Sequence, residues 1–586
     1  MHGQAFGTSG RVSGKIRGFL TPRYRRMRYH CLVATYYVEN FGCRATQADG
    51  AALARQFDAR GLARASTAAQ ADLLILNSCT VTASADQDAR AAIRRARRQN
   101  PKAKIIVTGC YAQRAPEEIA ALPGVTCVIG NSHKHQLAEI ALRDHSFARD
   151  HEASKLTGME LASVAELRGG RGLHGASGTP KSDFGWRSAS SAAKNSALLD
   201  GALAPEGSAF IPLASLTAAD PSPIFVSDIF AHTELLAAPV FEAGRSHGND
   251  RTRPNLKVQD GCDNRCSFCV IPYVRGQSRS LPLPEIIREV TTLVDAGYRE
   301  VVISGINLGR WGRDLNGDRH PATGSRNSDL AFPVPECRKP EAAFEDLIRT
   351  ILDETSLEKL RISSVEPMDW SDELIALVAE SPRIAKHAHV PLQSGSDTVL
   401  RRMHRKYRPW HYREKIEKIR NAMPAAAIGA DVMAGFPGET EAEFESTRRM
   451  IEDLPLTYLH VFTYSPRPGT PAAEMRNQVP VHVARERNRI LRELGTEKKQ
   501  AFMRSFIGKT VEAITLGEHF SSCHSEPLGA ARQRAESERG ISGQAFTEAL
   551  TDNYLKLRLR GCHQPNRWLR VRVEDVQGET LTGSAH

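Results

Sequence analysis

Three cysteines on one short segment carry the strongest chemical signal in the chain. Cys262, Cys266 and Cys269 form a C-x3-C-x2-C pattern directly after the strand-like run NLKVQD. Three thiolates on such a loop can each bind one iron of an iron–sulfur cube and leave the fourth iron without a protein ligand. A structural zinc site is the alternative, but it needs a fourth ligand and usually shows paired C-x2-C knuckles. The spacing therefore favours a cluster whose fourth iron is open to a small molecule.

A second set of cysteines is spread along the first 110 residues. Cys43, Cys79 and Cys110 each come just beyond a strand-like run, namely VATYYV, DLLILN and KIIVTG. The carboxyl ends of neighbouring parallel strands meet at the same edge of a sheet, so these three thiols can converge. Free cysteine is also a common core residue. The residues alone thus leave open a second metal site or three unrelated buried cysteines.

The elements around these cysteines predict an α/β fold in three parts. Alternating strand-like and helix-like runs between residues 33 and 140 predict a small parallel sheet covered by helices. Six further strand-like runs, separated by amphipathic helices, begin at residue 255 and predict a partial (βα)6 barrel with its chemistry at the carboxyl ends of the strands. The short strand-like pieces KTVEAIT, NYLKLRL and RWLRVRVEDV near the C-terminus predict a small β-barrel.

Changes in composition divide the chain further. Ser, Ala and Gly dominate the predicted linker, and Arg, Asn, Gly, Ser and Glu are frequent in two insertions at about 312–340 and 520–545. We expect a basic arm at 1–30, the α/β domain at 31–144, the linker at 145–247, the barrel at 248–480, a linking helix at 481–506 and the β domain at 507–586.

Charge and cysteine usage limit the class of protein. The formal net charge of +11 and the pI of about 9.1 suit a polyanionic partner without requiring one. Apolar runs stay far below the roughly 18 residues that a membrane helix needs, so we expect a cytoplasmic protein without a membrane partner. In that compartment thiols stay reduced, and the eleven cysteines favour metal ligands or redox groups over disulfides.

The loop from Cys262 to Cys269 resembles the cluster loop of the radical S-adenosylmethionine (radical SAM) superfamily. The order of the three parts resembles the methylthiotransferase family, whose last domain is the RNA-binding TRAM module. The resemblance implies a four-iron four-sulfur cluster on Cys262, Cys266 and Cys269, with S-adenosylmethionine chelating the open iron and being cleaved to a 5′-deoxyadenosyl radical. It also implies a second such cluster on Cys43, Cys79 and Cys110.

The resemblance further implies residues around the cofactor. Segments at the carboxyl ends of the barrel strands surround S-adenosylmethionine in related enzymes, and one aromatic residue lies between two cluster ligands. The positions that match are Phe268, Asn307, Ser363, Glu366, Gln393, Ser394 and Gly435. Five remaining cysteines match no ligand position and are expected to be structural or incidental: Cys31, Cys127, Cys337, Cys523 and Cys562.

Members of this family differ in substrate. The run CTVT that begins at Cys79 and the run TDNYLKL near the C-terminus resemble the group that modifies N6-threonylcarbamoyladenosine in tRNA. Thr46 departs from the asparagine common in relatives. Isopentenylated adenosine in tRNA and an aspartate of a ribosomal protein are the alternative substrates. An RNA-binding iron–sulfur or zinc protein without catalysis is the alternative from another class.

Two basic runs are candidates for contact with RNA phosphates. Arg94, Arg95 and Arg98 lie on one predicted helix with Arg97, and Arg401, Arg402 and Arg405 lie in the run RRMHRKYR. Runs of charge are usually solvated faces, which is the alternative for both. The expected partners are the anticodon loop of tRNA and an electron donor of the flavodoxin or ferredoxin type.

Overall fold

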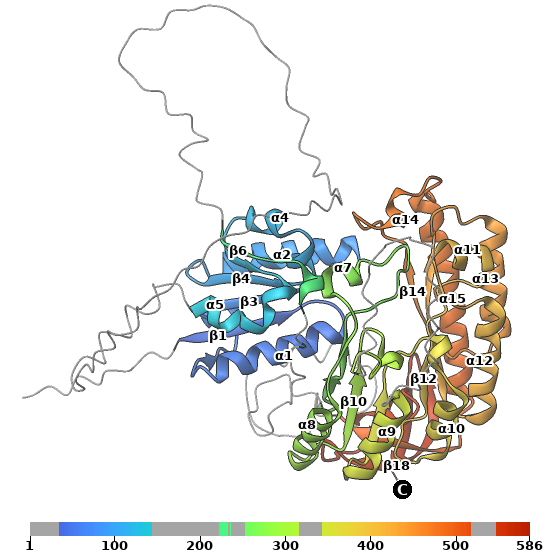
Figure 1. Ribbon diagram of the computed structural model, residues 1–586. Helices are drawn as coiled ribbons and strands as arrows, with labels where there is room; N and C mark the ends of the chain where they lie inside the picture. The colour runs from blue at the N-terminus through green and yellow to red at the C-terminus, as the bar shows by residue number, and fades with distance from the viewer. Residues whose placement is uncertain are drawn as a thin grey trace, which may run out of the picture.

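The computed structural model describes residues 34–142, 222–232, 235, 252–315, 343–516 and 546–585. They form three folded units, coloured blue, green to orange, and red in Figure 1. The predicted basic arm, most of the predicted linker and most of the two predicted insertions lie outside the described residues. The predicted fold class is confirmed, because the units are an α/β domain with a parallel sheet, a partial barrel of parallel strands and a closed β-barrel.

The N-terminal unit is a parallel sheet of six strands in the order β2-β1-β3-β4-β5-β6. Every residue of β3 is buried, since helices cover both faces of the sheet. Leu74 packs with Ile93 on one face and Leu73 packs with Leu53 on the other. The strands are β1 (Thr35–Asn40), β2 (Ala63–Arg64), β3 (Leu73–Ser78), β4 (Lys104–Gly109), β5 (Val125–Ile129) and β6 (Ile224–Phe225). The helices are α1 (Arg44–Asp58), α2 (Ala83–Gln99), α3 (Cys110–Arg114), α4 (Pro116–Ala120) and α5 (Leu137–Leu142).

Strand β6 corrects the prediction that 145–247 is only a linker. Val128 and Ile129 of β5 pair in parallel with Ile224 and Phe225, so the chain returns to the sheet edge before it enters the barrel. A strand of two residues is too short to give a periodic pattern. The sequence around it therefore indicated only a linker.

The central unit has the six predicted βα strands. Two three-stranded parallel sheets, in the orders β7-β10-β11 and β12-β13-β14, are joined by the parallel bridge between Ser364 and His389. The strands are β7 (Asn255–Lys257), β10 (Glu300–Ser304), β11 (Lys359–Ile362), β12 (His387–His389), β13 (Ala427–Ala434) and β14 (Tyr458–Thr463). Helices α8 (Leu283–Asp295), α9 (Phe344–Glu354), α10 (Asp372–Glu380), α12 (Pro409–Ala422) and α13 (Glu441–Asp453) follow them in sequence.

The two faces of these strands differ in polarity. Leu256, Ala388 and Val432 belong to the hydrophobic core under the helices. The residues that alternate with these along the strands are polar and contact one another. For example, a ring nitrogen of His389 lies 3.3 Å from a carboxylate oxygen of Asp431. The inner face of the partial barrel is therefore equipped to hold a polar ligand rather than to form a second core.

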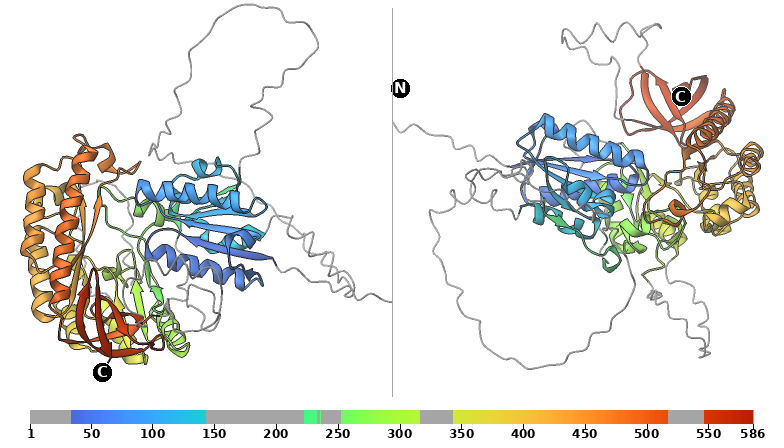
Figure 2. Two further views of the ribbon diagram at one scale, coloured as in Figure 1. Left: turned by 180° about the vertical axis from the view of Figure 1, so that it is seen from behind. Right: turned by 90° about the horizontal axis from the view of Figure 1, so that it is seen from above.

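The C-terminal unit is a closed barrel of five strands: β15 (Thr510–Thr515), β16 (Phe546–Thr551), β17 (Lys556–Arg560), β18 (Trp568–Gln577) and β19 (Thr580–Ala585). The turn between β16 and β17 docks on the partial barrel. The guanidinium of Arg361 in β11 donates to the backbone carbonyl oxygen of Asp552 at 3.0 Å. The side-chain amide of Asn553 donates to the backbone carbonyl oxygen of Ala425 at 3.0 Å. The C-terminal barrel, red in Figure 2, therefore lies against the partial barrel near the amino ends of its strands.

Helix α15 (Val481–Arg504) connects the two barrels, as the orange and red ribbons in Figure 1 show. It lies on β14, where a side chain at Gly495 would come 3.2 Å from Leu459. Although α15 has 24 residues, most of its surface is polar. Among the helices that the structure describes, none is both long and apolar enough to span a bilayer.

Candidate functional site

The loop with Cys262, Cys266 and Cys269 leaves the carboxyl end of β7 and is closed by two short antiparallel strands, β8 (Gln259–Asp260) and β9 (Arg279–Ser280). The amide of Cys269 donates to the oxygen of Cys266 at 3.1 Å, which folds the loop tightly. Gly261 has φ +72°, and a Cβ there would lie 1.9 Å from the oxygen of Gln277. Only glycine fits the start of this loop.

The three thiols of this loop are partly buried and lie close to one another. Burial raises the pKa of Cys269 to about 12, and the nearby Cys266 and Cys262 contribute to this shift. Burial also raises the pKa of Cys262 to about 11, with a smaller contribution from Cys266. Each thiol therefore lies within electrostatic reach of the next. A metal cluster would take them as thiolates and release their protons on binding. The donor set of three converging thiols on one loop fits one iron–sulfur cube.

Arg405 corrects one prediction, because its side chain is buried in this site instead of facing RNA. The residue is 7% exposed, and its guanidinium donates to the sulfur of Cys266 at 3.4 Å. The same guanidinium forms an ion pair with the carboxylate of Glu366. A cation at this position would offset the negative charge of a cluster bound through Cys266, and the basic run gave no indication of this placement.

Two of the predicted cofactor residues have unpaired buried amides. Neither polar side-chain atom of Asn307 has a hydrogen-bond partner among the described residues, although the residue is 3% exposed. The side-chain oxygen of Gln393 lacks a partner in the same part of the chain, and its backbone has φ +62°. Buried polar atoms without partners are costly. Their position at the strand ends fits a bound polar cofactor such as S-adenosylmethionine.

The other predicted cofactor residues have protein contacts. Phe268 packs edge to face on Phe436, with ring centroids 6.4 Å apart. Ser394 is fully buried and bonds to the hydroxyl of Thr447 at 3.1 Å, while Ser363 is buried just beyond β11. Gly435 has φ +78°, and a Cβ there would lie 2.4 Å from that of Ala484 in α15. The close approach at Gly435 is thus to a helix of the protein.

The second set of thiols also meets at one place. Cys43 precedes α1, Cys79 follows β3, and Cys110 begins α3 after β4. Burial, followed by the charges of Cys110 and Cys43, raises the pKa of Cys79 to about 12. Gly42 has φ +99°, and a Cβ there would lie 2.5 Å from that of Cys79, so glycine permits the approach of the two segments. Within the described ranges, no three His, Cys, Asp or Glu side chains form a site for a single metal ion.

The two sets of thiols belong to different domains but lie on one interface. Cys110 packs against Val270 and Val274. Val270 directly precedes helix α7 (Ile271–Arg275) and Val274 lies within it, and this helix follows Cys269 in the chain. Helix α7 thus leads from the ligand loop of the barrel to the cysteine site of the α/β domain (Figure 1). The two thiol sites are therefore joined by a direct packing contact between the domains.

Five buried charges hold this interface together. The carboxylate of Asp49 in α1 accepts from Lys134 at 3.0 Å and from Arg275 at 2.9 Å. Asp260 accepts from Lys257 at 2.8 Å and from Arg275 at 2.9 Å. Burial alone would lower the pKa of Arg275. The charges of Asp260 and, next in size, Cys110 outweigh burial and raise this pKa well above its usual value. Three cations face two carboxylates, and the excess positive charge lies beside the thiols.

Replacing one of these carboxylates should weaken the docking of the two domains. In Asp49→Asn, three buried cations would face Asp260 alone, so we expect the free energy of unfolding to fall by about 3–5 kcal/mol. Urea denaturation followed by tryptophan fluorescence and circular dichroism measures this change. Asp372→Asn, which removes an exposed partner of Lys418, is the matched control and should leave the free energy of unfolding nearly unchanged. Equal losses in the two variants would contradict a structural role for the network.

The remaining basic candidates lie on the surface. Arg94 and Arg98 of α2 are exposed and form no ion pair with a described residue. Arg95 pairs with Glu39 at 2.8 Å, Arg401 with Asp397 at 2.9 Å, and Arg402 with Glu443 at 2.9 Å. Arg94 and Arg98 therefore remain the surface arginines of these runs that are most available to phosphate.

Two family models match the chain, the Radical SAM superfamily at residues 256–451 and the uncharacterized protein family UPF0004 at residues 35–130. The threonylcarbamoyladenosine tRNA methylthiotransferase MtaB of Bacillus subtilis is 31% identical over 530 residues, which are 90% of this chain and 91% of the relative. The chain belongs to the radical SAM methylthiotransferases. As a member of this family it is a transferase that uses S-adenosylmethionine and iron–sulfur clusters.

Relatives with two different names resemble this methylthiotransferase. MtaB of Rickettsia prowazekii is 32% identical over 83% of this chain and 89% of the relative. The tRNA-2-methylthio-N(6)-dimethylallyladenosine synthase of Erythrobacter litoralis is 30% identical over 83% of this chain and 87% of the relative. Among solved structures, the radical S-adenosylmethionine methyltransferase TsrM of Kitasatospora setae aligns with a TM-score of 0.46 and 14% identity, covering 75% of this chain and 77% of that one.

Proposed function

We propose that this methylthiotransferase adds a methylthio group to C2 of N6-threonylcarbamoyladenosine next to the anticodon of tRNA. Cys262, Cys266 and Cys269 would hold the cluster that binds S-adenosylmethionine, and Cys43, Cys79 and Cys110 would hold a second cluster. The observation that carries the proposal is the contact of Cys110 with the helix that follows the barrel cysteines. Two thiol sites on one interface suit a reaction that joins radical and sulfur chemistry at one base.

The substrate follows from the relatives. MtaB proteins of Bacillus subtilis, Aquifex aeolicus and Rickettsia prowazekii are 29–32% identical to this chain and are named for threonylcarbamoyladenosine. The reaction would take place in the cytoplasm with the anticodon loop as partner and a flavodoxin- or ferredoxin-type protein as electron donor. Arg94 and Arg98 would bind tRNA phosphates, which position the loop without reading its bases.

The chain's own residues prepare the site for the cofactors. When bound, the clusters and S-adenosylmethionine supply radical and sulfur chemistry at a C–H bond that no side-chain base can deprotonate at neutral pH. The unpaired amides of Asn307 and Gln393 would bind the polar end of S-adenosylmethionine. Arg405 offsets the charge of the Cys266 thiolate, and the buried ion network keeps the two thiol sites at a fixed separation.

A direct assay tests this proposal. Reconstituted, reduced protein is incubated with S-adenosylmethionine and a sulfide source, together with an anticodon stem-loop that carries threonylcarbamoyladenosine, a stem-loop with isopentenyladenosine, or a ribosomal-protein peptide. Mass spectrometry should detect the methylthio product on the first substrate. Cys127→Ala, which replaces a buried cysteine outside both sets, is the control and should remain active. A product on either of the other substrates alone would overturn the substrate assignment.

A further inference from the structure

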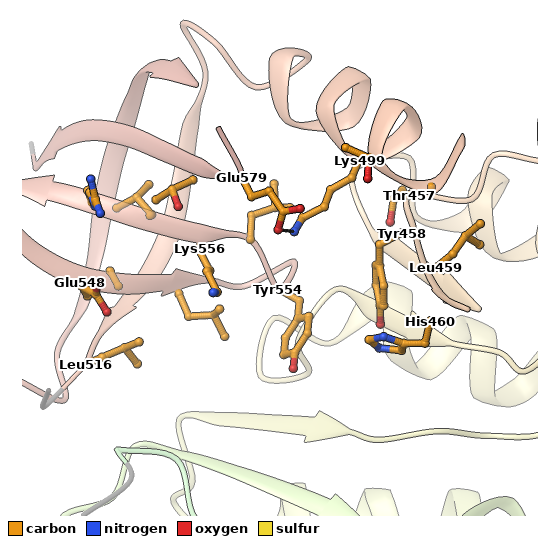
Figure 3. A pocket seen from close by; sticks show the side chains of 18 of the residues that line it. Thr457, Tyr458, Leu459, His460, Lys499, Leu516, Glu548, Tyr554, Lys556 and Glu579 are labelled. Atoms are coloured by element: carbon orange, nitrogen blue, oxygen red, sulfur yellow. Dashed lines mark hydrogen bonds and ion pairs between the residues drawn. The ribbon is translucent and has the colours of Figure 1, made fainter. Parts of the chain in front are cut away.

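A cavity of about 750 Å³ lies between strand β14, helix α15 and the C-terminal barrel. Figure 3 shows the aromatic rings of Tyr458, His460 and Tyr554 gathered at one end of it. The rings of Tyr458 and His460 lie 5.3 Å apart, and those of Tyr458 and Tyr554 lie 6.2 Å apart. The first pair meets edge to face and the second is tilted by 36°, so the three rings form a packed aromatic wall at this end of the cavity.

Tyr554 links this cavity to the second thiol site. Its hydroxyl accepts a hydrogen bond from a guanidinium nitrogen of Arg44 at 3.2 Å, and Arg44 directly follows Cys43 in the chain. Tyr554 has φ +69° and lies in the docked turn of the C-terminal barrel, which fixes its position. The guanidinium of Arg44 is therefore held between the proposed sulfur site and the aromatic end of the cavity.

Arg44 carries a charge that the described protein does not neutralise. Arg253 and Lys499, which line the cavity, pair with Glu300 at 3.3 Å and Glu579 at 2.7 Å. Arg44 is partly buried, and no carboxylate of the described residues forms an ion pair with it. Most of its five N–H donors therefore remain available. A partly buried guanidinium in this state suits an anionic ligand that it can bind with two hydrogen bonds.

The proposed substrate has such an anion close to its reacting carbon. In adenine, C2 and the carbon that bears N6 are both bonded to N1, so a group on N6 that points toward N1 lies at the same edge of the base as C2. The threonylcarbamoyl group ends in a carboxylate, whereas an isopentenyl group is neutral. A base whose C2 faces the sulfur site would thus bring its N6 substituent near the residues that flank Cys43.

We propose that Arg44, held by Tyr554, binds the carboxylate of the N6-threonylcarbamoyl group and selects this substrate over isopentenylated adenosine. The inference rests on the proposed function. A neutral substituent would leave the guanidinium partly buried and unpaired, which disfavours that substrate. Arg44 is thus a specificity-determining residue, and Tyr554 is the residue that positions it.

The test compares two forms of one substrate. An anticodon stem-loop with threonylcarbamoyladenosine and the same stem-loop with the methyl ester of that carboxylate are assayed for kcat/KM and for equilibrium binding. The unsubstituted protein should prefer the acid by about 10- to 100-fold, as expected for hydrogen bonds to a charged group. In Arg44→Gln the ratio should fall to near one, and in Tyr554→Phe it should fall by a smaller factor. Arg288→Gln, on the exposed face of α8, should keep the full preference.

The ratio separates recognition from general damage. A loss of the second cluster in Arg44→Gln would lower turnover on both substrates, and the binding ratio would still report the contact. An unchanged ratio in Arg44→Gln, or no preference in the unsubstituted protein, would overturn the inference. If the unsubstituted protein acts on isopentenyladenosine and on neither form of threonylcarbamoyladenosine, the proposed function itself fails.

Discussion

A Cys262→Ala variant is expected to form no 5′-deoxyadenosine from S-adenosylmethionine above the background without enzyme. The cube would keep only two protein ligands on a loop that offers no replacement, because the other free thiols of the described residues belong to the α/β domain. Anaerobic incubation with dithionite, followed by liquid chromatography and mass spectrometry, measures the product. Cys127→Ala, which alters a buried cysteine of β5, should cleave S-adenosylmethionine at the unsubstituted rate.

Measurable cleavage by the Cys262→Ala variant would contradict the assignment of the barrel loop. Iron analysis adds an independent readout, because the variant should keep the second cluster and so retain about four of about eight irons per chain. A variant with full iron content and no cleavage would show that Cys262 acts in some other way than as a ligand.

A Cys110→Ala variant should separate the two halves of the reaction. The barrel cysteines do not depend on Cys110, so reductive formation of 5′-deoxyadenosine should continue, while the methylthio product should fall to background. Cys110 is 1% exposed at the contact with Val270 and Val274, and alanine fills most of its volume, so the domains should remain docked. Both products are measured in one reaction with the threonylcarbamoyladenosine stem-loop.

Two outcomes would contradict this division. Continued methylthio transfer by Cys110→Ala would show that the second set of thiols is not the sulfur site. Loss of all cleavage with an intact first cluster, as judged by iron content and electron paramagnetic resonance, would mean that the two sites do not act separately. Cys127→Ala serves again as the control, since this buried cysteine lies in the same sheet.

Local pattern explains what could be predicted from the sequence. Each of Cys43, Cys79 and Cys110 follows a strand-like run, and parallel strands bring such positions to one edge whatever the helices between them contain. The barrel strands have apolar residues on one face, so their number and order could be predicted. The alternation of Asn255 and Lys257 in β7 with Gln259 at the start of β8 also indicates a polar inner face, although no prediction was drawn from it.

Contacts between residues far apart in the chain could not be predicted from the sequence. Asp49 and Arg275 are 226 positions apart, and nothing near either residue indicates an ion pair with the other. Arg405 was misplaced because a basic run shows charge but not which side chains turn inward to meet Glu366. The link from Arg44 to Tyr554 joins the first described domain to the last, so the sequence showed both residues without showing their relation.

The most direct test of the central claim is nucleoside mass spectrometry of tRNA from a host that lacks its own threonylcarbamoyladenosine methylthiotransferase, with and without this chain expressed. We predict that 2-methylthio-N6-threonylcarbamoyladenosine appears only when the chain is present, and that Cys262→Ala and Cys110→Ala both abolish it. If the protein is expressed with both clusters and the nucleoside stays unmodified, the claim that this chain methylthiolates threonylcarbamoyladenosine is contradicted.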